Sequence, residues 1–330
     1  MRVGMIGCGT AGRAHAEAYR DLPGVSLAAV ADADAGAAAG LAAQFGATVM
    51  SPAELVDSAV DVVDVATPTA LHAPWVGAAA RRGKHVLCET PLARTVEEAR
   101  SAIESCREAG VRLLPLHLHS FAPPLSKAGE LLAGGGIGKV GVVRITRRRP
   151  GIPASAGHWR GSLQESGGVI LEMLSQDIAF LLDCCGPVER VYAASTAWRE
   201  IMNGEYALVS LRFRSGAIAH LDGSWLAEQE GGDEFELAGS NGLVAFSAQS
   251  SSPLRLILGP DPGRSRILES PLAEGMYALG LAAVVKSLAG GSGPPVSPDL
   301  ALEVVEVSLA ALESAATGRV LTLGSKGVRQ

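Results

Sequence analysis

Short apolar runs alternate with longer amphipathic segments through the first third of the chain. The short runs lie at residues 3–6, 27–31, 62–66, 85–88 and 112–116. Segments with helical character lie between them, at about 11–20, 35–44, 69–82 and 95–109. Strands that alternate with helices at this spacing predict a parallel sheet with right-handed crossovers. We therefore expect an α/β domain over residues 1–120.

The pattern changes after about residue 120, where strand-like segments follow one another without intervening helices. These segments lie at 140–149, 188–198, 206–213, 217–226, 233–238 and 243–248. Such an order predicts a large, mainly antiparallel sheet. Helical patterns flank it at 124–134, 168–185, 276–289 and 299–316. We expect an α+β domain over residues 121–330, with one open sheet face that joins subunits of a homodimer or homotetramer.

Composition narrows the range of partners. The 330 residues suffice for two cores, and the formal net charge of −6 offers no basic field for nucleic acid. The one basic run, Arg147-Arg148-Arg149, is expected at a solvated strand end or an interface rim. No segment has the pattern of a signal peptide or a membrane span. We expect no nucleic-acid or membrane partner.

The cysteines and histidines predict a cellular compartment and the absence of a metal site. The five cysteines form no C-x-x-C pair and do not recur at the spacings of a disulfide framework. This usage favours the reducing cytoplasm. No cluster of histidine and cysteine has metal-ligand spacing, so we expect no metal.

A glycine-rich turn directly follows the first strand. Gly7, Gly9 and Gly12 form G-x-G-x-x-G, in which the first glycine allows the tight turn and the second lets the backbone approach a pyrophosphate. The third allows the following helix to pack closely, and the helix N-terminus favours the negative charge. We expect a Rossmann dinucleotide site here. The other members of the loop that we expect to contact the cofactor are Cys8, Thr10 and Ala11.

Asp32 lies 20 residues past Gly12, at the end of the second strand. A carboxylate at this position accepts hydrogen bonds from the adenosine ribose hydroxyls. It would repel a 2′-phosphate, and Ala33 offers no positive charge to bind one. NAD(H) is therefore favoured over NADP(H). The competing interpretation is a glycine-rich turn with a solvated aspartate.

Two proline-containing turns end the next strands. They are Thr67-Pro68-Thr69 and Glu89-Thr90-Pro91. Ligands of doubly wound sheets bind outside the carboxyl ends of the strands. We therefore expect Thr67, Pro68 and Glu89 to border the nicotinamide end of the cofactor.

Five short motifs occur in order along the chain. They are T-P-T-A-L-H at 67–72, G-K-H-V-L-C-E-T-P-L at 83–92, I-G-K at 137–139, W-R at 159–160 and G-G-V-I-L-E-M at 167–173. With these motifs the chain resembles the glucose–fructose oxidoreductase / inositol dehydrogenase / rhizopine catabolism (Gfo/Idh/MocA) family over nearly its whole length. The resemblance implies hydride transfer between NAD(P) and a carbon bearing a hydroxyl, often on a sugar or cyclitol. It also implies that His72, Trp159 and Arg160 lie near the cofactor.

The chain departs from this family at the polar residues that usually move the proton. The lysine of E-K-P and the Asp and His of D-x-x-x-H fall on Thr90, Glu172 and Gln176. Threonine cannot accept an alcohol proton at neutral pH and glutamine does not titrate, while Glu172 can act as a base from a shifted position. A positioned acid–base group contributes about 10²–10⁴ in rate. We therefore expect a non-standard acid–base site.

Three histidines are candidates to replace the missing groups. His117 and His119 are expected at the end of the fifth strand, two residues apart and on one face. His158 precedes the W-R element. We assign proton transfer to His119, and substrate contacts to His117 and His158. The alternative for each is an ordinary buried or surface histidine.

The leading interpretation is an NAD-dependent oxidoreductase for a small polar substrate, either sugar-like or a biosynthetic intermediate. An imine or alkene reductase would depend less on the missing lysine. A cofactor-binding regulator or complex subunit without turnover is the alternative from another class. Elimination or epimerisation through a transient ketone ranks below the first interpretation, because that route also needs a base.

Overall fold

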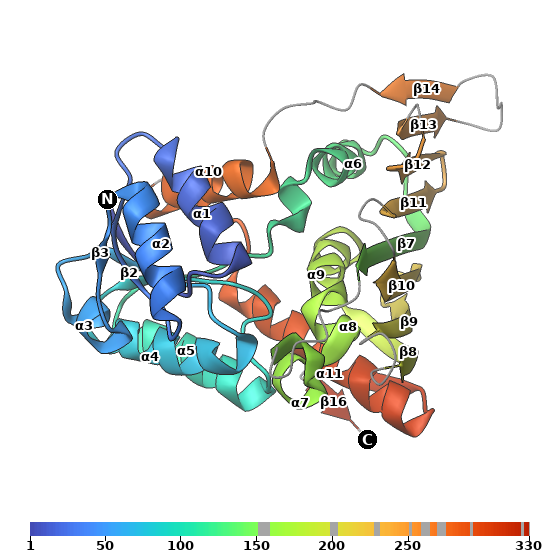
Figure 1. Cartoon of the computed structure of the whole chain (residues 1–330). Helices are drawn as coiled ribbons and strands as arrows, with labels where there is room; N and C mark the ends of the chain where they lie inside the picture. Colours follow the sequence, from blue (N-terminus) through green and yellow to red (C-terminus); the bar gives the residue numbers. More distant parts are fainter. Residues whose placement is uncertain are drawn as a thin grey trace. The chain divides into compact units, whose positions relative to one another are not determined.

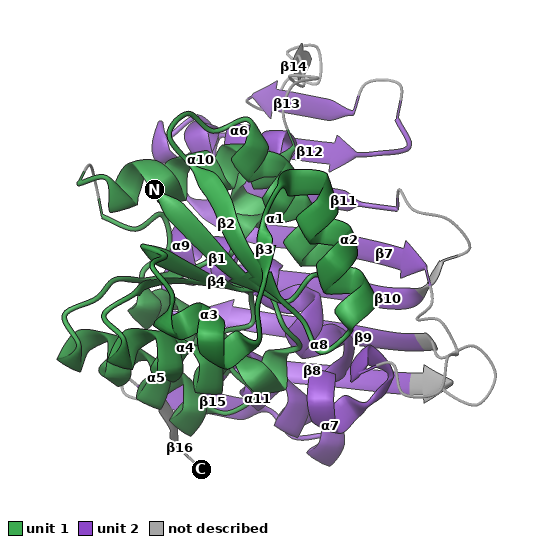
Figure 2. Ribbon diagram, turned by 60° about the vertical axis from the view of Figure 1, so that its left-hand side comes forward, with its two compact units in different colours: residues 1–121, 274–305 green, residues 122–273, 306–330 purple. Residues whose placement is uncertain are grey.

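The computed structural model describes residues 1–150, 159–198, 204–227, 232–250, 253–258, 265–268, 275–290, 293–324 and 327–329. The chain divides into two compact units (Figure 2). The first comprises residues 1–121 and 274–305, and the second comprises residues 122–273 and 306–330. No helix within the described ranges is long and apolar enough to cross a membrane.

The first unit is built on a parallel six-stranded sheet in the order β3-β2-β1-β4-β5-β6. The strands are β1 (Arg2–Ile6), β2 (Ser26–Ala31), β3 (Thr48–Val49), β4 (Val62–Val65), β5 (His85–Cys88) and β6 (Leu113–Pro115). The predicted parallel Rossmann sheet is confirmed. The short edge strand β3 is an addition that the apolar pattern does not predict.

Helices cover both faces of this sheet (Figure 1). They are α1 (Thr10–Arg20), α2 (Ala35–Phe45), α3 (Pro52–Asp57), α4 (His72–Arg81), α5 (Val96–Glu108) and α10 (Met276–Leu288), with 3-10 turns η1 (Thr69–Leu71) and η2 (Leu118–Phe121). Helix α10 packs against α1 and η2, although it comes from late in the chain. Leu281 and Val284 of α10 join the core that Val3 and Met5 of β1 begin.

The second unit contains a ten-stranded sheet in the order β14-β13-β12-β11-β7-β10-β9-β8-β15-β16. The strands are β7 (Val140–Pro150), β8 (Val188–Trp198), β9 (Gly204–Phe213), β10 (Ile218–Ala227), β11 (Glu234–Gly239), β12 (Gly242–Ser247), β13 (Leu254–Leu258), β14 (Ser265–Leu268), β15 (Leu321–Gly324) and β16 (Gly327–Arg329). The β7–β10 pair is parallel and the assigned pairs around it are antiparallel. The predicted large, mainly antiparallel sheet is confirmed.

One face of the second sheet packs against helices. The helical elements of this part of the chain are α6 (Pro123–Ala133), η3 (Trp159–Gly161), α7 (Leu163–Ser166), α8 (Gly168–Glu172), α9 (Leu174–Cys185) and α11 (Pro298–Thr317). Residues 168–185, expected as one helix, form α8 and α9, which meet at Met173, where φ is −107° instead of the usual helical value of about −63°. Helix α9 packs on β7 and β10.

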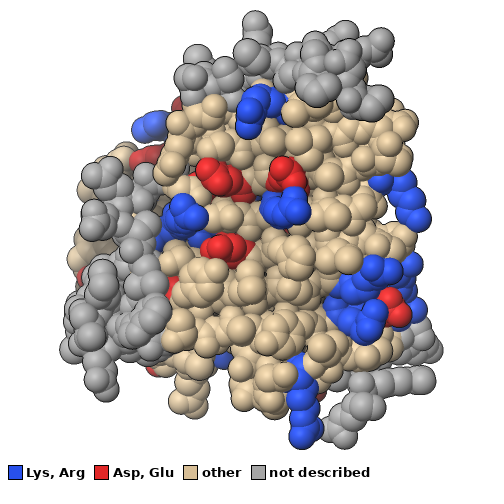
Figure 3. Space-filling view, turned by 90° about the vertical axis from the view of Figure 1, so that its right-hand side faces the viewer, with Lys and Arg blue, Asp and Glu red and all other residues tan. Residues whose placement is uncertain are grey.

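The opposite face of this sheet is open in the single chain. Tyr192 is 41% exposed and Leu208 is 37% exposed, although both are large apolar side chains. Figure 3 shows that uncharged side chains dominate this side of the molecule, with a few separate charged groups among them. Alternation along the strands explains the contrast with buried residues such as Val143 and Ile145, which face the helices.

Candidate active site

The glycine loop has the geometry that a pyrophosphate needs. Gly7 has φ +107°, and a Cβ there would collide with the Ala66 carbonyl. At Gly12 a Cβ would meet the Gly7 carbonyl oxygen. A Cβ on Gly9, in contrast, would find no atom of the chain within 4 Å. Since internal packing does not require glycine at position 9, the open space beside it fits a ligand that approaches the backbone.

Helix α1 starts at this loop with an open N-terminus. Thr10 and Ala11 are its first residues, Gly9 is its N-cap, and no side chain accepts a hydrogen bond from the first-turn N–H groups. The first N–H groups of an α-helix have no partner within the helix. They are therefore available, together with the helix dipole, to an anionic group such as a pyrophosphate.

Asp32 lies beside the loop and is held by two backbone groups. Its Oδ2 accepts a hydrogen bond from the Cys8 N–H at 2.6 Å, and its Oδ1 accepts one from the Asp34 N–H at 2.8 Å. Burial, with the nearby Asp32 charge, raises the pKa of the Cys8 thiol to about 11. Cys8 is thus a neutral, buried side chain that contributes to the loop through its backbone.

His72 joins the two proline-containing turns. Its Nδ1 lies 2.8 Å from the Pro91 carbonyl oxygen, and its Nε2 lies 2.8 Å from the Thr67 carbonyl oxygen. Burial lowers the pKa of His72, so the ring is neutral at neutral pH and one N–H donates at a time. His72 therefore fixes the turn at Pro68 relative to the turn at Thr90.

Two polar groups near these turns have no hydrogen-bond partner within the described residues. They are the buried Thr67 hydroxyl and the His117 imidazole, of which both nitrogens are buried. Buried polar groups are almost always paired in a complete site. Together with the open space at Gly9, they indicate that this edge of the first unit is shaped for a ligand. The residues fit a dinucleotide.

A buried polar cluster lies behind the Glu89 turn, and sequence reasoning missed it. The His15 Nδ1 lies 2.9 Å from Asp64 Oδ2, and the His15 Nε2 lies 3.0 Å from Glu89 Oε1. The Tyr19 hydroxyl donates to Asp64 Oδ2 at 2.6 Å. An aspartate within the wholly buried strand Val-Val-Asp-Val was the available signal, because an ionised carboxylate is rarely buried without a partner.

Mutual interactions determine the protonation states within this cluster. Burial disfavours the charged form of His15, but the carboxylates of Asp64 and Glu89 favour that form more strongly. Their combined effect raises the pKa of His15 to about 10. Burial likewise opposes ionisation of Glu89, but hydrogen bonding and charge from His15 lower its pKa. At neutral pH, His15 is an imidazolium and Glu89 a carboxylate.

His117 and His119, which we expected at the end of the fifth strand, both lie beyond the end of that strand. The strand in question, β6, ends at Pro115, and His119 lies in the 3-10 turn η2. The two-residue alternation of a strand therefore does not apply, and the argument that His117 and His119 share one strand face is wrong. Burial lowers the pKa of His117 to about 3, so its ring stays neutral.

In the second unit, Trp159, Arg160 and Glu172 lie together. The Arg160 guanidinium lies 5.2 Å from the centroid of the Trp159 ring, and its Nε is 3.7 Å from Glu172 Oε2. Gln176 lies four residues after Glu172, in the first turn of α9. His158, the third candidate histidine, lies outside the described residues.

Arg147 anchors α9 and is not solvated, contrary to expectation. Its Nη2 lies 2.6 Å from Asp177 Oδ1, and its Nε lies 3.1 Å from Asp177 Oδ2, with both side chains buried. Arg149 pairs with Asp233 at the same strand end. The strand alternation explains the correction, because Arg147 shares the helix-facing side of β7 with Val143 and Ile145.

The predicted residues thus form two sets. In the first unit the structure brings together Gly7 with Cys8 and Asp32, and Thr67 with His72 and the Glu89–Pro91 turn. In the second it brings Glu172 to Arg160. Within the described residues, no group of three or more histidine, cysteine, aspartate or glutamate side chains could hold a metal ion.

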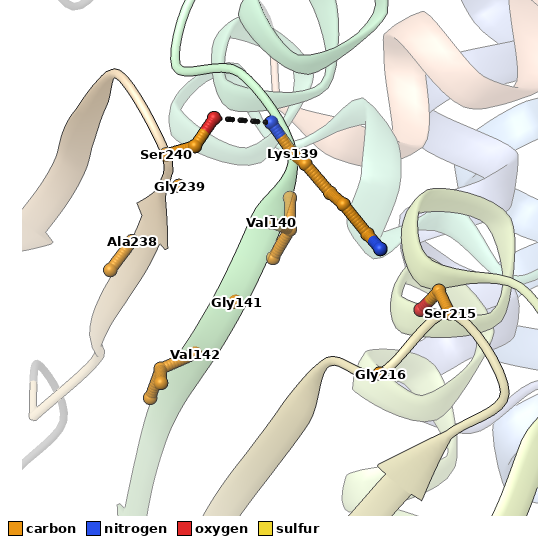
Figure 4. A pocket seen from close by; sticks show the side chains of 9 residues that line it. All are labelled: Lys139, Val140, Gly141, Val142, Ser215, Gly216, Ala238, Gly239 and Ser240. Carbon is orange, nitrogen blue, oxygen red and sulfur yellow. Dashed lines mark hydrogen bonds between the residues drawn. The ribbon is translucent and has the colours of Figure 1, made fainter.

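A separate surface pocket lies at one end of the second sheet. Its lining comes from the start of β7, the β9–β10 turn and the end of β11 (Figure 4). The Lys139 side chain extends toward Ser215, and the Lys139 backbone N–H donates to Ser240 Oγ at 3.1 Å. None of the predicted site residues lines it, and its other side chains are small and uncharged. Lys139 is the one titratable residue among the described residues that line it.

Comparison with known families establishes the chain's relationships. The model of the oxidoreductase family with an NAD-binding Rossmann fold matches residues 1–117, and the model of the GFO/IDH/MocA C-terminal domain matches residues 125–245. The 1,5-anhydro-D-fructose reductase of Ensifer adhaerens is 32% identical over 296 residues, covering 87% of each chain. The chain belongs to the Gfo/Idh/MocA oxidoreductase family.

Two further proteins are similar to this Gfo/Idh/MocA chain along most of its length. The NADP-linked D-xylose 1-dehydrogenase 2 of Haloferax volcanii is 28% identical over 305 residues, covering 90% of this chain and 91% of the relative. The structure of levoglucosan dehydrogenase with NADH and levoglucosan matches with a TM-score of 0.87 at 24% identity, covering 98% of this chain and 99% of the other. This structural similarity supports the fold described above for each of the two units.

Proposed function

We propose that this chain is an NAD-dependent oxidoreductase that acts on a small polar substrate, sugar-like or a biosynthetic intermediate, through a non-standard acid–base site. The observation that carries the proposal is the glycine loop, with its open space at Gly9 and the Asp32 carboxylate fixed beside it. The relatives named above act on sugars and sugar derivatives, which supports the substrate class. The five cysteines are free thiols, which supports a cytoplasmic site of action.

Asp32 supports NAD over NADP. The carboxylate is held by the N–H groups of Cys8 and Asp34, so it cannot swing away from a 2′-phosphate without breaking both hydrogen bonds. Thr67, Pro68, His72 and Glu89 would border the nicotinamide half of the cofactor. Trp159 and Arg160 are further proposed cofactor contacts, as the family resemblance implies. When bound, the nicotinamide supplies or accepts the hydride.

The chain's own residues must hold and move the hydroxyl proton. We assign proton transfer to His119, with Glu172 as a second base and with Thr90 and Gln176 as hydrogen-bonding groups. His117, neutral and without a partner within the described residues, can donate or accept one hydrogen bond to a substrate oxygen. His158 remains a proposed substrate contact.

Turnover with a substrate panel tests this function. The purified chain is incubated with NAD⁺ and a set of polyols and sugars, and with NADH and a set of ketoses, imines and conjugated alkenes, while reduced nicotinamide absorbance is followed. We expect turnover with at least one polyol or sugar. Cofactor binding without any turnover would support the regulatory alternative, and turnover confined to imines or alkenes would support the reductase alternative.

A pair of variants then tests the proton-transfer assignment. His119→Gln should lower kcat about 10²-fold and remove one limb of the pH–rate profile, because glutamine cannot titrate. The matched control His220→Gln changes an exposed histidine whose ring contacts Ser210 on the sheet face. Equal rates for His119→Gln and the unaltered chain would remove His119 from this role.

A further inference from the structure

The buried cluster of His15, Asp64 and Glu89 lies directly behind the Glu89–Pro91 turn, which we expect to border the nicotinamide end of the cofactor. We propose that this cluster holds one net negative charge behind the Glu89–Pro91 turn, so that the chain binds oxidised cofactor more tightly than reduced cofactor. The inference rests on the proposed function, because it requires that the first unit binds NAD. It goes further by giving the chain a thermodynamic preference for the oxidised form.

The geometry makes the three groups one unit. His15 comes from α1, Asp64 from the middle of β4, and Glu89 from the residue after β5. The His15 ring bridges the two carboxylates at 2.9 Å and 3.0 Å. The side chains of His15 and Asp64 are fully buried, and the side chain of Glu89 is 12% exposed.

The cluster is also tied to the turn that is expected to face the cofactor. The second oxygen of Glu89, Oε2, accepts a hydrogen bond from the Thr90 N–H at 2.9 Å. In a sheet of this order, ligands lie across the carboxyl ends of the central strands. Glu89 is therefore the member of the cluster nearest the ligand edge, and Asp64 and His15 lie behind it.

Two carboxylates and one imidazolium leave a net charge of −1. Among the residues that the structure describes, the other titratable groups around the cluster do not cancel it. Burial raises the pKa values of Tyr19 and Cys88 well above their usual range, and it lowers the pKa values of His72 and His117, so all four are neutral at neutral pH. The Tyr277 ring of α10, with its centroid 5.3 Å from that of His15, covers another side.

The net charge distinguishes the two forms of the cofactor. The oxidised nicotinamide ring carries a positive charge that the reduced ring lacks, so a fixed negative charge attracts only the oxidised ring. Unit charges several ångströms apart in a partly buried site interact strongly enough for about a tenfold preference. The remainder of the cofactor is common to both forms, so the preference appears in the ratio of the two dissociation constants.

The test measures Kd for NAD⁺ by calorimetry and Kd for NADH by its fluorescence, using the unaltered chain and three variants. Glu89→Gln removes one negative charge with little change of shape, and the ratio Kd(NADH)/Kd(NAD⁺) should fall about tenfold. Tyr19→Phe is the matched control, because it removes a hydrogen bond to Asp64 without changing the charge. Its ratio should stay within about twofold of the unaltered chain.

His15→Gln provides a second, independent readout. The unaltered chain should give a constant ratio from about pH 6 to pH 8, since the pKa of His15 is raised to about 10 and that of Glu89 is lowered. Without the imidazolium, the two buried carboxylates share one proton at the lower pH and lose it as the pH rises. The ratio in this variant should therefore increase with pH.

The outcomes separate failure of this inference from failure of the proposed function. An unaltered chain that binds neither NAD⁺ nor NADH contradicts the proposed function. If the unaltered chain binds both, three results would each overturn the charge assignment. They are equal shifts of both Kd values in Glu89→Gln, a ratio change in Tyr19→Phe as large as in Glu89→Gln, and a pH-independent ratio in His15→Gln.

Discussion

At Asp32, two backbone hydrogen bonds turn an ordinary acidic side chain into a fixed negative charge. The carboxylate accepts from Cys8 within the glycine loop and from Asp34 at the start of the next helix. A fixed carboxylate selects against a 2′-phosphate by repulsion, whereas a mobile one could turn away. Cofactor preference in this chain therefore depends on a single residue and its two backbone donors.

The Asp32→Ser variant should change cofactor preference. Loss of the carboxylate removes the repulsion of a 2′-phosphate and the acceptor for the ribose hydroxyls, so Kd for NAD⁺ should rise while Kd for NADP⁺ falls. We expect the ratio Kd(NADP⁺)/Kd(NAD⁺) to drop by about tenfold or more. Asp34→Ser, which removes a neighbouring acidic group but keeps a capping residue at the N-cap of α2, is the matched control. An unchanged ratio in Asp32→Ser would contradict the assignment.

His117 should make the chain sensitive to acid. Burial lowers its pKa from the usual 6.5 to about 3, so the unfolded state binds a proton in this window that the folded state excludes. The stability contributed by the neutral ring is present above about pH 6.5 and is lost as the pH falls toward 3. Within that window the loss approaches about 1.4 kcal/mol per pH unit.

Urea unfolding at several pH values measures this effect. The slope of stability against pH between about 6 and 4 should be shallower in His117→Asn than in the unaltered chain, by about one proton. His220→Asn is a suitable control, since His220 is exposed on the sheet face. Identical slopes for the unaltered chain and His117→Asn would show that His117 takes up its proton in the folded state.

At the scale of elements, the hydrophobic pattern predicted the buried strands correctly. It did not predict where one residue ends a strand or where an ion pair makes a charged side chain buried. Strands β1, β2, β4 and β5 are apolar runs buried on both faces, so their pattern is unambiguous. The run at 112–116 ends earlier than predicted, because Pro115 closes β6 and a 3-10 turn carries His119. Arginine is usually a surface residue, so the sequence predicts that Arg147 is exposed. Its burial depends on an ion pair with Asp177, which lies 30 positions later in the chain.

The cofactor loop was predictable because its requirements are local. Backbone conformation at Gly7, close packing at Gly12 and the carboxylate at the end of β2 all fall within one strand–helix–strand unit. The His15 cluster was not predictable in the same way, because its members come from three elements whose pairing follows from strand order. A single histidine on a helix carries no signal of its partners.

The pair of Arg147 and Asp177 should stabilise the second unit through α9. Asp177→Asn leaves the buried Arg147 guanidinium with only its longer contact to Asp233 at 3.7 Å, so this variant should destabilise the chain by about 3 kcal/mol. The double variant Arg147→Met with Asp177→Leu removes both charges and should recover most of that loss. Chemical unfolding followed by circular dichroism measures both, and a double variant no more stable than Asp177→Asn would contradict an electrostatic origin.

At the scale of the whole molecule, the open sheet face supports self-association. We propose that this face joins subunits, because Tyr192 and Leu208 are exposed apolar side chains on it and large apolar patches are unusual on isolated proteins. Light scattering should give the mass of a dimer or tetramer. Leu208→Glu should dissociate it, whereas Val49→Glu, an exposed apolar residue of the first unit, should not. A monomeric unaltered chain would contradict this proposal.

The central proposal for this chain is hydride transfer with a non-standard proton-transfer site. The most direct test follows the hydrogen itself. The chain is incubated with NAD⁺ and a panel of sugars and polyols deuterated at their hydroxyl-bearing carbons, and the reduced cofactor is analysed by mass spectrometry. We predict that deuterium from at least one compound appears on the nicotinamide ring. Tight NAD⁺ binding with no label from any compound would contradict the claim.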